Sequence, residues 1–144
     1  MAETLGSLCD KLIIVKLKAY HTKRDDRERM EKLSSQDMQL RKEINEYVSD
    51  AASRKIPLEK LTCETLKVHT GVIALDNLIV SIGGSMATLA DVNCDIWHLQ
   101  EKLYNFEKVP AGLKNMVVRQ IAVSNIKRTK CIDDINQQFK ELLK

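Results

Sequence analysis

The stretch LADVNCDIWHLQEKLYNF, residues 89–106, decides the fold class of this chain. Its apolar residues recur at alternating steps of three and four, which is the spacing of one helix face and of a coiled-coil seam. The pattern predicts a long amphipathic helix that packs along a neighbouring helix. The apolar residues of this seam are Leu89, Val92, Ile96, Leu99, Leu103 and Phe106.

Helical patterns also lie on both sides of this stretch. A turn is expected over residues 109–112, which contain Pro110 and Gly112, and a last helix from about Leu113 to Leu143. Upstream, apolar stripes predict helical structure over residues 5–20 and about 33–53. The charged run 23–32 between them either bends a single helix or connects two separate helices. The expected inner face of the last helix is Val117, Ile121, Ser124, Arg128, Cys131, Ile135 and Leu142.

Residues 53–82 give a weaker pattern. Pro57 ends the preceding helix because it lacks an amide hydrogen. Residues 72–82 are apolar nearly all round, which predicts a shorter central helix capped at its end by the glycines at 83–84. The expectation is an all-α helical bundle of four long helices plus a shorter central helix, forming a single domain over residues 1–144.

The two halves of the chain also echo each other. The dipeptides Gly6-Ser7 and Gly83-Gly84 lie 77 positions apart, and each begins a helical pattern. Each half later carries an acid-Ile-Asn triplet, at residues 43–45 and 134–136. Such a repeat would make the bundle two related helical hairpins, although amphipathic helices also resemble one another by chance.

Composition narrows the classes of function. Apolar residues make up 44% of the 144 positions and charged residues 30%, as in an ordered, soluble domain. The net charge of +3, spread over interleaved acids and bases, disfavours nucleic acid as a partner. The four cysteines lack CxxC spacing, so neither a metal site nor a cofactor is expected. The sequence shows neither a secretory signal nor a segment that could span a membrane, and it predicts a cytoplasmic protein.

Two charged residues interrupt the apolar faces. Asp37 lies between Leu33 and Leu40, and Arg128 lies between Ser124 and Cys131. A charge that faces a core must be paired or solvated, because burying it alone is costly. Arg128 is therefore expected either to meet a carboxylate of the bundle or to extend past the helix edge into water. The candidate carboxylates are Asp37, Asp91 and Asp95.

A polar face accompanies the seam of residues 89–106. Asp91, Asp95 and His98 are spaced i, i+4 and i+7, so they share one side of the helix. Such a set could bind a divalent metal or perform acid–base chemistry, with Arg128 as an anion clamp. The alternative interpretation is that these groups are solvated or pair with Lys127 and Arg128.

The last third of the chain resembles an uncharacterised bacterial family, domain of unknown function 4254. The family carries Trp-His-Leu-Glu, then Ser-Asn-x-x-Arg-Thr, then an acidic-Ile-Asp ending; this chain has Trp-His-Leu-Gln at 97–100, Ser-Asn-Ile-Lys-Arg-Thr at 124–129 and Ile-Asp-Asp-Ile at 132–135. Gln100 and Lys130 depart from the acids of the family pattern.

The resemblance covers mainly residues 91–140 and implies an all-helical protein. It also implies a link to bacterial surface-polysaccharide gene clusters, and no established reaction. The polar site that it implies consists of Trp97, His98, Asn125, Arg128 and Thr129.

These patterns favour a non-catalytic binding or accessory protein. It would self-associate, at least as a dimer, or bind a protein partner, because coiled-coil-like seams are often completed by a second chain. Trp97 is expected to be a packing or interface residue. The alternative is a small metal- or acid-base-dependent enzyme that acts on a phosphorylated or sugar-linked substrate.

Overall fold

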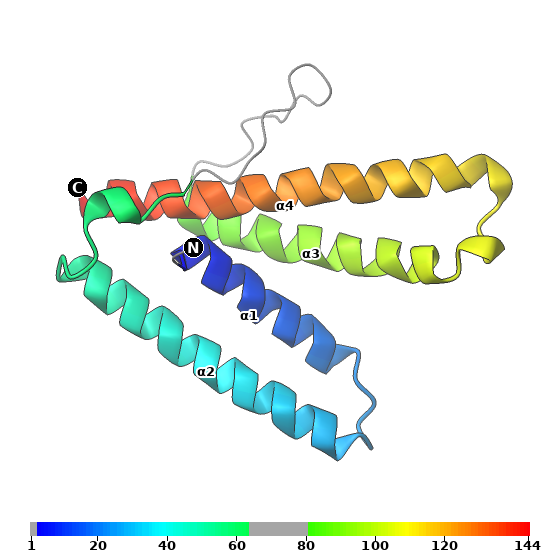
Figure 1. The fold of residues 1–144 in the computed structure, drawn as a ribbon, viewed down its shortest axis with the longest axis horizontal. Coiled ribbons are helices and arrows are strands. Elements are labelled where there is room, and N and C mark those ends of the chain that lie inside the picture. Colours follow the sequence, from blue (N-terminus) through cyan, green and yellow to red (C-terminus); the bar gives the residue numbers. More distant parts are fainter. Residues whose placement is uncertain (1–2, 64–80) are drawn as a thin grey trace.

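The computed structural model describes residues 3–63 and 81–144, and in these ranges the chain is all-helical. The predicted all-α class is confirmed there, while the predicted central helix lies outside the described residues except at positions 81 and 82. Three single turns of 3-10 helix lie in the connections, at Leu58–Lys60, Phe106–Lys108 and Ala111–Leu113. The long helices are α1 (Leu5–Tyr20), α2 (Arg27–Ala52), α3 (Ile82–Tyr104) and α4 (Lys114–Leu143) (Figure 1).

Side-chain caps set where the helices begin. The Thr4 hydroxyl accepts the amide hydrogen of Ser7 at the start of α1, and Asp26 accepts that of Arg29 at the start of α2. Because α1 ends at Tyr20 and α2 begins at Arg27, the charged run joins two helices rather than bending one.

The start of α3 corrects one prediction. The Ser81 hydroxyl accepts the amide hydrogen of Gly84 at 3.0 Å, so α3 begins at Ile82 and both glycines lie in its first turn. The prediction that Gly83 and Gly84 end a helix is therefore wrong. The physical reason is that serine is a strong N-cap, so a helix begins directly after Ser81 and includes the two glycines.

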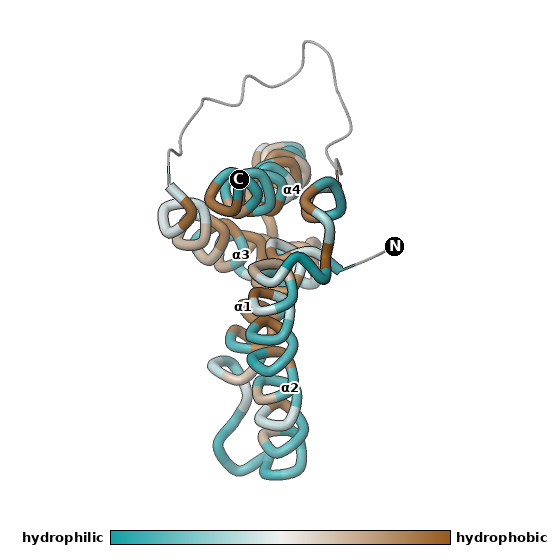
Figure 2. Tube along the Cα trace, turned by 90° about the vertical axis from the view of Figure 1, so that its left-hand side faces the viewer, coloured by the Kyte–Doolittle hydropathy of each residue, from teal (hydrophilic) through white to brown (hydrophobic). Residues whose placement is uncertain are grey.

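The helices form two antiparallel hairpins, α1–α2 and α3–α4 (Figure 1). α1 packs against both α3 and α4, whereas α2 contacts mainly α1. The α1–α2 hairpin therefore runs obliquely to the α3–α4 hairpin, and the two diverge away from the chain termini (Figure 1). Figure 2 shows α1–α2 projecting from the α3–α4 pair, which is seen there nearly end-on. This pairing matches the two hairpins suggested by the internal echo.

The core lies at the end where the two hairpins meet. It combines the first half of α1, the end of α2, the first half of α3 and the last half of α4. Its most enclosed side chains include Leu8, Ala51, Leu61, Leu89 and Ile135, each at most 2% exposed. The hydrophobic effect therefore acts mainly at one end of the molecule.

The predicted apolar faces are buried only over part of their length. Leu89, Val92 and Ile96 are buried on α3, but Leu103 is 43% exposed. On α4, Leu142 is 69% exposed, contrary to the expected inner face, and Phe139 is buried instead. Full burial of α3 stops where the α1–α2 hairpin diverges from it, and beyond that point α4 is the only long helix of the described residues that packs on the seam.

Gly6 allows the closest approach between α1 and α4. A Cβ atom at this position would lie 2.4 Å from the carbonyl oxygen of Ile132 and 2.9 Å from Oδ1 of Asn136. The same Oδ1 accepts the Gly6 amide hydrogen at 2.7 Å, and Asn136 Nδ2 donates to the Thr4 hydroxyl at 3.0 Å. The first turn of α1 is thus held directly against α4.

Replacing Gly6 with alanine is expected to destabilise the protein by about 1–3 kcal/mol, because the added methyl group forces the two backbones apart. The measurement is the free energy of unfolding from urea titration. Gly83→Ala is the matched control, since nothing lies within 4 Å of its Cβ and alanine favours the helix. Equal stability of the two variants would contradict the close α1–α4 contact.

The four cysteines are free thiols, two of them in the core. Burial, with a smaller effect of Asp10, raises the pKa of the Cys9 thiol to about 11. Burial also raises the pKa of Cys131. Both side chains therefore act as small apolar residues at neutral pH.

The free energy of unfolding is expected to fall more steeply in the wild type than in Cys9→Ala as the pH rises from about 9 to about 11. The folded protein holds the thiol proton more tightly than the unfolded chain, so this contribution is complete below the unfolded pKa and is lost above it. Urea titrations at several pH values measure the difference, and parallel profiles for the two proteins would contradict the burial of this thiol.

Candidate functional site

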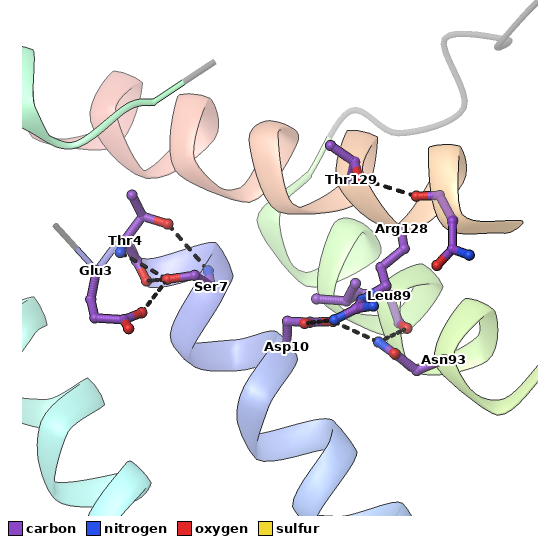
Figure 3. A network of polar contacts seen from close by, with 9 residues as sticks. Glu3, Thr4, Ser7, Asp10, Leu89, Asn93, Arg128 and Thr129 are labelled. Carbon is purple, nitrogen blue, oxygen red and sulfur yellow. Dashed lines mark hydrogen bonds and ion pairs between the residues drawn. The ribbon is translucent and has the colours of Figure 1, made fainter. Parts of the chain in front are cut away.

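A buried carboxylate joins three helices near the centre of the molecule. Asp10 on α1 is 4% exposed and accepts two hydrogen bonds from Arg128 on α4, at 2.9 Å from Nε and 2.6 Å from Nη2 (Figure 3). Asn93 on α3 donates to the same carboxylate at 2.9 Å and to the Leu89 carbonyl at 3.1 Å. The site thus links α1 to both helices of the α3–α4 hairpin.

The geometry of this cluster offsets the cost of burying a charge. The guanidinium group binds both carboxylate oxygens, the strongest arrangement of an arginine–carboxylate pair. The hydrogen bonds that Arg128 donates to Asp10 raise the pKa of Arg128, against an opposing effect of desolvation. The guanidinium and the carboxylate thus form a bidentate ion pair, to which Asn93 adds a third hydrogen bond.

Arg128 meets a carboxylate as predicted, but none of the three expected partners supplies it. Its partner is Asp10, which lies 118 positions away in the sequence. Asp37 instead binds Lys16 and Arg41 on the α1–α2 hairpin, and these hydrogen bonds lower the pKa of Asp37. The two charges that interrupt the apolar faces therefore belong to separate ion pairs.

The other predicted site residues do not gather at one place. Asp91 is exposed and has no partner among the described residues, whereas Asp95 and His98 line a cavity between α3 and α4. Asn125 is exposed, and its carbonyl accepts the Thr129 hydroxyl at 3.1 Å within α4. The polar site implied by the family resemblance is thus spread over several faces of the hairpin.

Trp97 lies at the contact between the end of α1 and the middle of α3. The His21 ring stacks on it with a centroid distance of 4.5 Å and an interplanar angle of 18°, and the indole nitrogen donates to Glu101 at 2.9 Å. His98 meets His21 edge-on at 6.1 Å. Trp97 is therefore a packing residue, as expected, and the echo-related residues His21 and His98 are neighbours in space.

The described residues offer no ready metal site. Within 3–63 and 81–144, no three His, Cys, Asp or Glu side chains are placed so that they could hold one ion. The set Asp91, Asp95 and His98 shares a helix face in sequence, but only the last two line the same cavity.

A cavity lies between the distal halves of α3 and α4. This α3–α4 cavity has a volume of about 490 Å³, and its apolar floor includes Leu99, Met116 and Val123. A second hollow of similar size adjoins it toward the connection between the helices, with Val109, Leu113 and Val117 in its lining. The polar lining of the α3–α4 cavity includes Asp95, His98, Lys102, Arg119, Gln120 and Lys127.

Sequence reasoning found Asp95 and His98 but missed the rest of the cavity and the partner of Arg128. One signal was present: Gly6, Cys9, Asp10 and Ile13 form a second face on α1 beside the leucine stripe. A glycine and a cysteine on one face indicate close packing against another helix. Asp10 lies on this face, so its carboxylate would be buried there and would need a cation.

No family model, curated protein or solved structure matches the chain. The resemblance to the bacterial family and the link to surface-polysaccharide gene clusters therefore stay predictions. No helix in the described part is both long and apolar enough to cross a membrane.

Replacing Arg128 with methionine is expected to destabilise the protein by about 2–3 kcal/mol, below the range for a fully buried pair because the arginine is partly exposed. The Asp10 carboxylate would lose the one cation that pairs with it among the described residues. The free energy of unfolding is the measurement, with Arg119→Met on an exposed part of the same helix as the control. Adding Asp10→Asn should recover part of the loss, and an Arg128→Met protein as stable as the control would contradict the role of the pair.

Proposed function

We propose that this protein is a non-catalytic binding module that captures an apolar, acidic segment of a partner protein on the distal half of its α3–α4 hairpin. The observation that carries the proposal is the clustering of exposed apolar side chains there. Five of the nine large hydrophobic residues that are exposed among the described residues fall between positions 103 and 118. These five define the distal face: Leu103, Tyr104, Leu113, Met116 and Val118.

The distal face borders a groove that is already formed. The α3–α4 cavity and the adjoining hollow share His98, Lys102, Met116 and Gln120 in their linings, so together they run along the distal hairpin. The stretch of α4 from Met116 to Lys127 that borders the cavity is about 16 Å long at the rise of an α-helix. A helical segment of about a dozen residues would match that length.

Packing supports a missing third element at this end. Leu89 and Ile135 are at most 2% exposed at the core end, whereas Leu103, Leu113 and Met116 are each more than 40% exposed. Leu113 and Met116 also line the adjoining hollow, and exposed apolar side chains around a groove are typical of a binding surface. A partner segment bound along the groove would cover the distal half of the α3–α4 hairpin, as α1 covers the other half.

Charge favours an acidic partner over a second copy of this chain. Residues 99–127 contain five basic and two acidic side chains, a net charge of +3 that equals the net charge of the whole protein. Two distal faces packed on each other would bring like charges together, whereas an acidic segment would neutralise them. The predicted dimer is therefore the less favoured occupant of this surface.

The arrangement of polar groups lends less support to the alternative, a small enzyme. Arg128 was the expected anion clamp, but both of its bonds go to Asp10, and it does not line the α3–α4 cavity. Asp91 does not line the cavity either. The acid–base set proposed from the sequence is thus divided between different surfaces.

Selection of binders from a random library of displayed peptides of about twelve residues is expected to enrich sequences that combine Leu or Ile with Asp or Glu. Met116→Asp should weaken their binding at least tenfold, because it adds a negative charge to the apolar lining. Met38→Asp, at an exposed methionine of α2, is the matched control and should leave affinity unchanged. Fluorescence anisotropy of labelled peptides gives the dissociation constants.

Two results would contradict this function. The first is enrichment of basic peptides, or of peptides whose binding survives Met116→Asp. The second is a stable dimer, seen by sedimentation equilibrium, that Met116→Asp dissociates, because it would assign the distal face to a second copy of the chain.

A further inference from the structure

The α3–α4 cavity carries more positive charge than it neutralises. Lys102, Arg119 and Lys127 line it, and none of them forms a hydrogen bond or ion pair with any residue of the described ranges. Asp95 is the single carboxylate among the cavity's charged lining residues. Elsewhere on α4, by contrast, Arg128 and Lys130 are paired with Asp10 and Asp134.

The charges are also unevenly distributed along the cavity. Because α3 and α4 are antiparallel, Lys102 and Arg119 lie at the end nearer their connection, and Asp95 and Lys127 lie at the other end. The Asp95 end thus has one charge of each sign. The end with Lys102 and Arg119 keeps two positive charges that no carboxylate in the lining balances.

The chemistry of that end suits a phosphate group. Two positive charges match a phosphate monoester, which carries close to two negative charges at neutral pH. Arginine can bind two phosphate oxygens at once, and lysine adds a point charge. His98 and Gln120 lie in the same lining and can donate further hydrogen bonds.

We propose that Lys102 and Arg119 form an anion site for a phosphate monoester, with His98 and Gln120 as additional hydrogen-bond donors. The site does not depend on the partner proposed above, since it rests on the cavity's charges and not on the distal face. The phosphate can belong to a small phosphorylated molecule or to a phosphorylated side chain of a bound protein, and the two sources share the same chemistry.

Inorganic phosphate is the first probe. Its binding is monitored through the amide chemical shifts in NMR titrations in which chloride keeps the ionic strength constant. Phosphate is expected to shift the amides around residues 98–102 and 119–120 in a saturable manner. Arg119→Gln and Lys102→Gln should each weaken binding at least tenfold. Lys127→Gln should weaken it less, because Asp95 already balances that charge.

The control is Arg24→Gln, which removes the same charge from an exposed position between α1 and α2. It should leave phosphate affinity unchanged. The proposal is overturned if Arg24→Gln weakens binding as much as Arg119→Gln, or if the shifts do not saturate, since both results indicate general screening. These outcomes do not bear on peptide capture, which Met116→Asp tests separately.

A second arm distinguishes the two sources of phosphate. A phosphoserine peptide with flanking leucines is compared with free phosphoserine. Tighter binding of the peptide that Leu113→Asp abolishes assigns the phosphate to a protein partner, because Leu113 lines the adjoining hollow and not the α3–α4 cavity. Equal affinity of the two ligands assigns the phosphate to a small phosphorylated molecule. Failure of both ligands to compete with inorganic phosphate overturns the monoester assignment.

Discussion

The buried carboxylate of Asp10 is the constraint on which the rest of this structure depends. A nearly inaccessible negative charge is tolerable only where a cation and hydrogen-bond donors meet it, and Arg128 and Asn93 do so from two other helices. The position of α1 on the α3–α4 hairpin is therefore fixed by chemistry as well as by apolar contact. The contact of Gly6 with Asn136 fixes the same helix one turn earlier.

Anchoring α1 at this point leaves the molecule uneven along its length. The core, both buried polar links and the buried cysteines lie where the hairpins meet, while no other helix of the described residues covers the distal half of α3–α4. In the function proposed above, stability and binding are thus assigned to opposite ends of one hairpin. The core end can hold the helices in register while the distal end presents exposed apolar and basic side chains, which is the division that a binding module needs.

Local sequence pattern was enough to predict the helices, and tertiary geometry explains what it missed. The seam of residues 89–106 correctly predicts α3, but periodicity alone does not reveal that, among the described residues, its second half packs only on α4 and the connection to it. The need of Arg128 for a carboxylate follows from its place on an apolar face, whereas the identity of Asp10 depends on how α1 crosses α4. Spacing along one helix placed Asp91 with His98, but the cavity between two helices selects only some residues of that face.

Hydrogen exchange measured residue by residue on the native protein tests this uneven architecture most directly. The account predicts slow exchange for backbone amides of residues 89–96 and 131–139, which surround the Asp10 cluster and open only in global unfolding. It predicts much faster exchange for residues 99–104 and 114–120, on which no third helix of the described residues packs. Equal protection along the whole of α3 and α4 would contradict it, because the distal hairpin would then be as firmly packed as the core.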